Sequence, residues 1–163
     1  MSGLNSIEKR AAISLALVFG LRMLGLFMIM PVFAIYGQDL EGYSPLWVGI
    51  AIGAYGLTQA CLQIPMGMLS DRYGRKLIIL IGLVIFCIGS LVAAYSDSVL
   101  GVTIGRAIQG MGAIASTILA LAADVTRDEN RPKVMAVIGM CIGLSFAVSL
   151  IVGPVLVESI GLA

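Results

Sequence analysis

A short polar turn, GMLSDRYGRK at residues 67–76, separates two long apolar runs of the chain. Gly67 and Gly74 allow helices to approach closely and the chain to reverse tightly. Asp71 can stabilise a helix N-terminus, where the helix dipole is positive. Three residues of the turn can anchor at lipid headgroups or pair with acids, namely Arg72, Arg75 and Lys76. A generic basic loop would explain these charges, but it would not explain two glycines and an aspartate at these spacings.

The apolar runs on either side of the turn belong to a series that fills most of the chain. Of the 163 residues, 60% are hydrophobic and 12% are charged, and the mean hydropathy is +1.05. Soluble domains carry about 25% charged residues, and about 20 apolar residues span a bilayer as a helix. Five runs reach that length, at about residues 11–34, 46–69, 77–95, 100–122 and 134–157. Because backbone groups in lipid must be satisfied within the segment, we predict an all-α protein with five transmembrane helices.

The basic residues fall on one side of the predicted membrane. They precede the first run or lie in the loops after the second and fourth, at Lys9, Arg10, Arg72, Arg75, Lys76, Arg127, Arg131 and Lys133. The loops on the other side contain Asp39, Glu41 and Asp97 but no Lys or Arg. By the positive-inside rule, the N-terminus is cytoplasmic, and five crossings place Ala163 on the outer side.

Two arginines lie inside predicted spans, where an ionisable side chain costs ~2.5–3.5 kcal/mol on insertion scales. Arg22 is near mid-depth of the first span, and Arg106 lies close to the outer end of the fourth. No acidic residue lies at mid-depth of a span. The partner of these guanidinium groups is therefore an anionic substrate group, a carboxylate in another part of the protein, or backbone and water. A structural alternative is neighbouring carbonyls, or the side chains of Gln59 and Gln63.

Two stretches of the sequence resemble signatures of the major facilitator superfamily of transporters. Residues 67–76 match its G-x-L-x-D-R-x-G-R-K signature at every defined position. Residues 106–113, RAIQGMGA, are similar to its R-x-x-Q-G-x-G-A signature. Gly153 and Pro154 resemble the core of its antiporter signature, although larger residues follow them than is usual.

This resemblance implies a carrier of twelve helices in two six-helix halves, each half a 3+3 inverted repeat, with the substrate path between the halves. Residues 1–163 would be an incomplete N-terminal half with five helices. Its partners would be the lipid bilayer, a small-molecule substrate, protons and the missing C-terminal half. The implied function is proton-coupled efflux of a drug or metabolite across the bacterial inner membrane. The alternative is a truncated remnant that does not transport, or a small membrane interaction protein.

The resemblance also implies roles for the polar residues inside the spans. Arg106 corresponds to an arginine that is assigned to proton coupling in related antiporters. We expect Arg106 and Gln109, three residues apart on one helix face, to point into the substrate cavity rather than at lipid. We expect Arg22 to share that cavity.

The polar turn is expected to act as a conformational latch. Arg75 would pair with Asp124 at the end of the fourth span, and Asp71 would contact a helix N-terminus of the other half. The remaining residues of the latch are Gly67, Arg72, Gly74 and Lys76.

The other features of the sequence are expected to serve packing. Glycines four residues apart allow close helix contact, at Gly49/Gly53, Gly101/Gly105 and Gly139/Gly143. Prolines within spans favour kinks, at Pro31, Pro65 and Pro154. The chain has no histidine and its three cysteines lie inside apolar runs, so we expect no metal site, no cofactor and no enzyme. The net charge of +1 follows from membrane topology and does not indicate nucleic-acid binding.

Overall fold

The computed structural model describes residues 3–160, apart from the side chains of residues 30–32, 34–36, 156, 157, 159 and 160. The position expected for Ala163 therefore lies outside the described residues. The elements are α1 (Ser6–Tyr36), η1 (Gly37–Asp39), α2 (Pro45–Tyr73), α3 (Arg75–Ala94), α4 (Val99–Met111), α5 (Ala115–Asp124), η2 (Asp128–Asn130) and α6 (Arg131–Ile160). Five stretches are long and apolar enough to cross a membrane, as predicted from the sequence.

Local capping chemistry explains where the helices begin. Asn5 caps α1 in a capping box with Glu8, and the Ser44 hydroxyl accepts a hydrogen bond from Trp47 N ahead of α2. The Ser98 hydroxyl does the same for Gly101 N in α4. Gly74 joins α2 to α3 with φ +101°, a conformation that other residues adopt only with strain.

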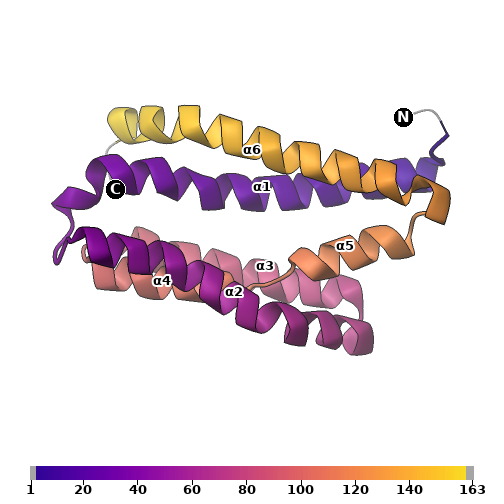
Figure 1. The fold of residues 1–163 in the computed structure, drawn as a ribbon, viewed down its shortest axis with the longest axis horizontal. Coiled ribbons are helices and arrows are strands. Elements are labelled where there is room, and N and C mark those ends of the chain that lie inside the picture. The colour runs from indigo at the N-terminus through magenta and orange to yellow at the C-terminus, as the bar shows by residue number, and fades with distance from the viewer. Residues whose placement is uncertain (1–2, 161–163) are drawn as a thin grey trace.

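The helices form two layers that α5 connects. In Figure 1, α1 and α6 lie side by side along their lengths, and α2, α3 and α4 form the second layer. The α5 helix contacts both layers. Large apolar side chains also face outward, including Leu57, Ile64 and Ile151, as expected for helices surrounded by lipid.

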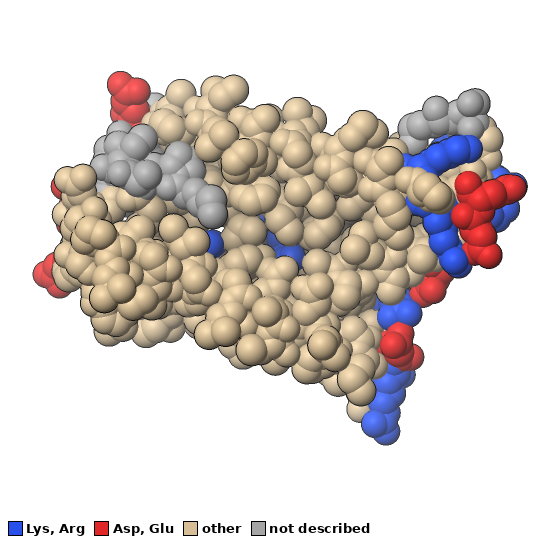
Figure 2. Space-filling model, in the orientation of Figure 1, with Lys and Arg blue, Asp and Glu red and all other residues tan. Residues whose placement is uncertain are grey.

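Charged residues are concentrated at the ends of the bundle. Figure 2 shows basic and acidic residues together at the end that carries the N-terminus, which we call the basic end. This face of the opposite end shows acidic residues only, and the apolar body lies between. A few basic atoms are visible within the middle of that body.

The fourth span is broken, whereas the sequence predicted one helix over residues 100–122. The α4 helix ends at Met111 and α5 begins at Ala115, and Ile114 N donates to Gly112 O at 2.9 Å across the gap. A Cβ added at Gly112 would collide with the carbonyl of Gly82 in α3. Close packing of α3 against the gap therefore accompanies the break. By contrast, α2 continues through Pro65 and α6 continues through Pro154.

Close packing between glycines occurs at one crossing and not at the others that were expected. A Cβ at Gly105 of α4 would lie 2.8 Å from the carbonyl oxygen of Gly89 in α3, so these backbones are in direct contact. Four of the expected glycines make no such contact within the described chain, because a Cβ there would meet nothing within 4 Å, at Gly49, Gly53, Gly139 and Gly143. Those glycines lie on outward faces of α2 and α6.

Candidate functional site

Arg22 is buried at the break in the fourth span. It is 3% exposed, and its Nη2 donates a hydrogen bond to Gly112 O at 2.7 Å. Its guanidinium lies 5.3 Å from the centre of the Phe86 ring in α3. Its Nε and Nη1 have no hydrogen-bond partner in the described chain. Arg22 thus binds one of the carbonyls that the helix break releases, and keeps unused donors.

Arg106 is equally buried and belongs to a longer chain of hydrogen bonds. It is 2% exposed, and its Nη1 donates to Gln109 Oε1 at 3.0 Å. Gln109 Nε2 then donates to Ser90 Oγ of α3 at 2.8 Å. The guanidinium also lies 4.9 Å from the centre of the Tyr55 ring in α2. Arg106 and Gln109 are therefore directed into the α2–α3–α4 packing and not at lipid.

Tyr55 lies beside Arg106. It is 8% exposed, and its hydroxyl has no partner among the described residues. Gln59 and Gln63, which the sequence offered as partners for the arginines, contact each other instead, with Nε2 to Oε1 at 3.5 Å. The arginines are met by the Gly112 carbonyl and the Gln109 amide.

The polar turn at residues 67–76 contains the ion pair expected from the sequence. Arg75 Nε donates to Asp124 Oδ2 at 3.0 Å, and Arg75 also forms an ion pair with Asp71 and donates to Ser70 Oγ at 2.8 Å. One guanidinium thus joins the ends of α2, α3 and α5. The Asp71 side chain is 63% exposed, so it stays accessible to another part of the protein.

The other residues of the turn are on its surface or support it. The Gly67 carbonyl accepts a hydrogen bond from Ser70 Oγ at 2.6 Å. Arg72 lies over the Tyr73 ring at 5.7 Å, and Lys76 is exposed.

A second cluster at the basic end was missed by the sequence reasoning. Glu8 of α1 is 3% exposed and accepts hydrogen bonds from Arg127 N, Nε and Nη2 at 3.0–3.1 Å. Asn130 Nδ2 donates to the same carboxylate at 3.2 Å, and Asn5 N donates at 2.7 Å. The hydrogen bond to Glu8 raises the pKa of Arg127. The Asn5–Glu8 capping-box spacing was a readable signal, but its partners over a hundred residues away were not.

Comparison with known proteins decides the family. The model of the Major Facilitator Superfamily matches residues 15–163. The chain belongs to this superfamily. It is therefore a multi-pass membrane protein of a family of transporters rather than enzymes, and such proteins act on a substrate in a lipid bilayer.

Three relatives illustrate the similarity. The inner membrane transport protein YajR of Escherichia coli is 53% identical over 155 residues, which cover 95% of this chain and 34% of YajR. An uncharacterized transporter of Buchnera aphidicola (subsp. Schizaphis graminum) is 46% identical, covering 97% of this chain and 40% of the relative. The class H tetracycline resistance protein of Pasteurella multocida is 31% identical, covering 90% and 36% respectively. The chain thus spans between a third and two fifths of the length of these relatives.

The second superfamily signature, residues 106–113, coincides with the broken helix. Its glycines have packing roles, because a Cβ at Gly110 would collide with the Tyr55 carbonyl and one at Gly112 with the Gly82 carbonyl. The arginine and glutamine of this signature form the hydrogen-bonded pair described above. The partial antiporter signature lies in α6, where Gly153 is buried and Pro154 is half-buried.

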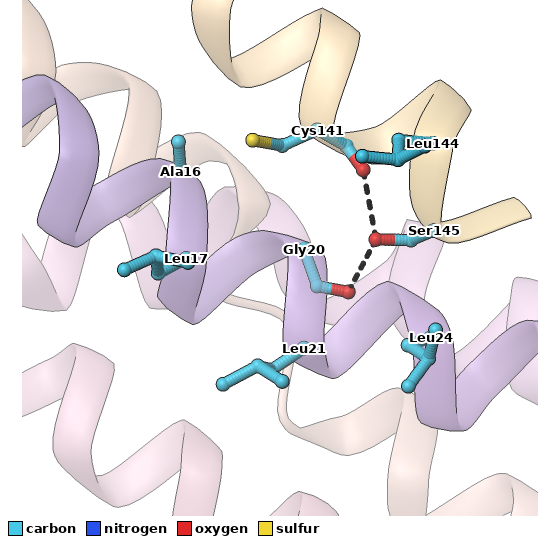
Figure 3. Close-up of a pocket in the computed structure, with 8 residues that line it drawn as sticks. All are labelled: Ala16, Leu17, Gly20, Leu21, Leu24, Cys141, Leu144 and Ser145. Carbon is cyan, nitrogen blue, oxygen red and sulfur yellow. Dashed lines mark hydrogen bonds between the residues drawn. The ribbon is translucent and has the colours of Figure 1, made fainter. Parts of the chain in front are cut away.

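The cavity shown in Figure 3 is separate from these polar groups. It has a volume of about 150 Å³ and lies between α1 and α6, lined by Leu17, Gly20, Leu21 and other mostly apolar residues. The Ser145 hydroxyl donates to Gly20 O at 2.8 Å and Cys141 O at 2.7 Å. Because its one polar side chain is already hydrogen-bonded, this cavity is a packing groove. Within residues 3–160, no group of His, Cys, Asp and Glu side chains is arranged to hold a metal ion.

Proposed function

We propose that this chain forms part of a carrier that moves a small molecule by alternating access, as proton-coupled efflux. The observation that carries the proposal is the pair of buried arginines, Arg22 and Arg106, inside the apolar bundle of a superfamily member. Ionisable groups inside membrane spans mark substrate or ion pathways. The name of the tetracycline resistance protein among the relatives supports efflux.

The proposed arrangement takes residues 1–163 as part of the N-terminal half, with a C-terminal half as its partner across the substrate path. The basic end would face the cytoplasm, because Lys and Arg favour that side of the membrane. The inner membrane is the proposed location, supported by the printed name of YajR. Arg22, Arg106 and Gln109 would line the path from α1 and α4.

The turn between α2 and α3 would act as a latch in this cycle. Arg75 joins three helix ends through Asp71 and Asp124. A movement of α2 relative to α5 would therefore break one of these two ion pairs. Asp71 is exposed enough to bind a helix N-terminus of the C-terminal half in one of the two states.

Proton coupling requires a group that titrates near the path. The described spans carry no acidic residue at mid-depth, so the titrating carboxylate would come from the rest of the protein. The positive charge of Arg106 would then favour the ionised form of this carboxylate.

Everted membrane vesicles that contain the full-length protein provide the test. A pH gradient, acid inside, should drive uptake of at least one member of a broad set of anionic, neutral and cationic compounds, and a protonophore should abolish it. Arg106→Gln should lose this uptake while inserting normally. Uptake that is the same with and without the protonophore would disprove proton coupling, and uptake no greater than in empty vesicles for a broad set of compounds would disprove efflux.

A further inference from the structure

We infer that Arg22 binds the carboxylate of a ligand. This inference rests on the proposed transport function, and it names the charge of the substrate that the function leaves open.

Arg22 carries more hydrogen-bond donors than the described chain satisfies. A guanidinium carries five N–H donors, and the described chain supplies one acceptor, Gly112 O. Nε and Nη1 are buried with no partner. A buried charge without partners is costly, so natural proteins pair such groups. The free donors therefore indicate an acceptor that binds from outside the described chain.

The free N–H groups of Arg22 lie side by side in one plane. Nη2 has two N–H groups, and Gly112 uses one of them. The other lies in the guanidinium plane beside an N–H of Nε or of Nη1, both of which are free. Two parallel N–H groups in one plane match the two oxygens of a carboxylate. Phe86 covers a face of the guanidinium at 5.3 Å, and the free Nε and Nη1 are buried, so a carboxylate reaches them in a state of the protein that opens this part of the bundle.

The surroundings of Arg22 hold other unsatisfied and charged groups. The Tyr55 hydroxyl of α2 is also buried without a partner in the described chain. Arg106, 4.9 Å from the centre of the Tyr55 ring, adds a second buried positive charge. Neither arginine forms an ion pair within the described chain. A site with two cations and no anion attracts an anionic group.

The two arginines differ in how they are held. Arg106 donates to Gln109, and Gln109 in turn donates to Ser90. That chain of bonds positions Arg106 within the protein. Arg22 donates to one backbone carbonyl, and its Nε and Nη1 are buried without a partner in the described chain. The ligand contact therefore falls to Arg22, and Arg106 contributes through its charge.

The test measures equilibrium binding of radiolabelled benzoate to the purified full-length protein in nanodiscs of uncharged lipid. Benzamide, which has the same shape without the charge, is the matched probe. We expect saturable binding of benzoate and none of benzamide. Arg22→Gln keeps a donor for Gly112 O but loses the charge and the parallel donors, and we expect about 10- to 100-fold weaker binding, typical of a lost charged hydrogen bond.

Three further variants sharpen the result. Arg22→Lys, which keeps the charge without the planar fork, should bind with intermediate affinity. Arg10→Gln removes the same charge at the basic end and should bind benzoate as the wild type does. Arg106→Gln should weaken binding less than Arg22→Gln. Size-exclusion chromatography establishes that each variant is folded.

The inference is overturned if the wild type fails to bind benzoate, if benzamide binds equally well, or if Arg22→Gln binds as the wild type does. If a carboxylate of the C-terminal half pairs with Arg22, the wild type will fail to bind benzoate. Vesicle uptake separates the two proposals. Uptake without benzoate binding supports the transport function and disproves the carboxylate site at Arg22. Benzoate binding without uptake supports the site and disproves the transport function.

Discussion

Two charged side chains of α1, Glu8 and Arg22, are equally buried and are treated very differently by the rest of the chain. Each is 3% exposed. The Glu8 carboxylate accepts hydrogen bonds from the backbone or side chains of Asn5, Arg127 and Asn130. Within the described residues, the Arg22 guanidinium has one acceptor, the carbonyl of Gly112. A charge that its own chain satisfies is part of the framework, whereas one left with free donors is available to a ligand.

The difference follows from where the two residues lie. Glu8 is at the basic end, where the loop between α5 and α6 supplies donors that need no helix to unwind. Arg22 lies against the middle of α3 and the end of α4. Within a helix, the backbone carbonyls already accept hydrogen bonds from the same helix. At the break between α4 and α5, the Gly112 carbonyl accepts from Ile114 N and has room for a second donor, which Arg22 supplies.

The largest effect is expected from Glu8→Ala. Arg127 and Asn130 would lose their shared acceptor, and α1 would lose its capping box and its tie to the α5–α6 loop. We expect the largest fall in thermal-unfolding midpoint of the variants considered, while the folded fraction still binds benzoate. Glu129→Ala is the matched control, because Glu129 also pairs with Arg127 but is 70% exposed. Equal midpoints for the two variants would refute the framework role of Glu8.

A large effect on transport rather than stability is expected from Asp71→Asn. The substitution removes a charge from the latch while Arg75 keeps Asp124 and Ser70. We expect transport to fall about 5- to 150-fold, the range of a typical coupling between two states. Insertion and melting should be close to wild type. Undiminished vesicle uptake would rule out the latch.

A smaller effect is expected from Gly112→Ala, which tests the acceptor of Arg22. The backbone of Gly112 suits alanine, at φ −74°, but the added Cβ would collide with the Gly82 carbonyl. Overpacking of this kind costs about 1–3 kcal/mol of stability. Gly139→Ala is the control, because nothing lies within 4 Å of its Cβ position. That change should be neutral or stabilise by up to about 1 kcal/mol, since alanine favours helix. Equal denaturation curves for the two variants would contradict the packing at the break.

The smallest effect is expected from Asp128→Asn, at the same end of the bundle as Glu8. The Asp128 carboxylate pairs with Arg131 at 2.7 Å, but its side chain is 87% exposed. Exposed pairs contribute about 0–1 kcal/mol, so the stability should hardly change, and added salt should reduce the difference further. A loss comparable to that of Glu8→Ala would show that burial does not distinguish the two ion pairs.

Much of the site could be anticipated from residue type and spacing. The Arg75–Asp124 contact followed from an acid and a base at the same predicted depth, and the structure contains it. That Arg106 and Gln109 avoid lipid followed from the cost of exposing them there, and both are buried. Their place in a substrate cavity stays a prediction. The partner of Glu8 could not be anticipated, because Arg127 lies 119 residues away and nothing local in the sequence links the two.

The sequence by itself determined the membrane class, the number of spans and the superfamily signatures. These depend on hydropathy and on residues close together in the chain, which act through local free energies that add along a segment. Only the tertiary structure decided that the fourth span breaks at Gly112, and that Arg22, 90 residues away, binds the released carbonyl. The physical reason is that lipid favours an unbroken helix for any apolar run. A break is tolerated only where distant segments pack against it and satisfy its backbone, as Gly82 and Arg22 do here.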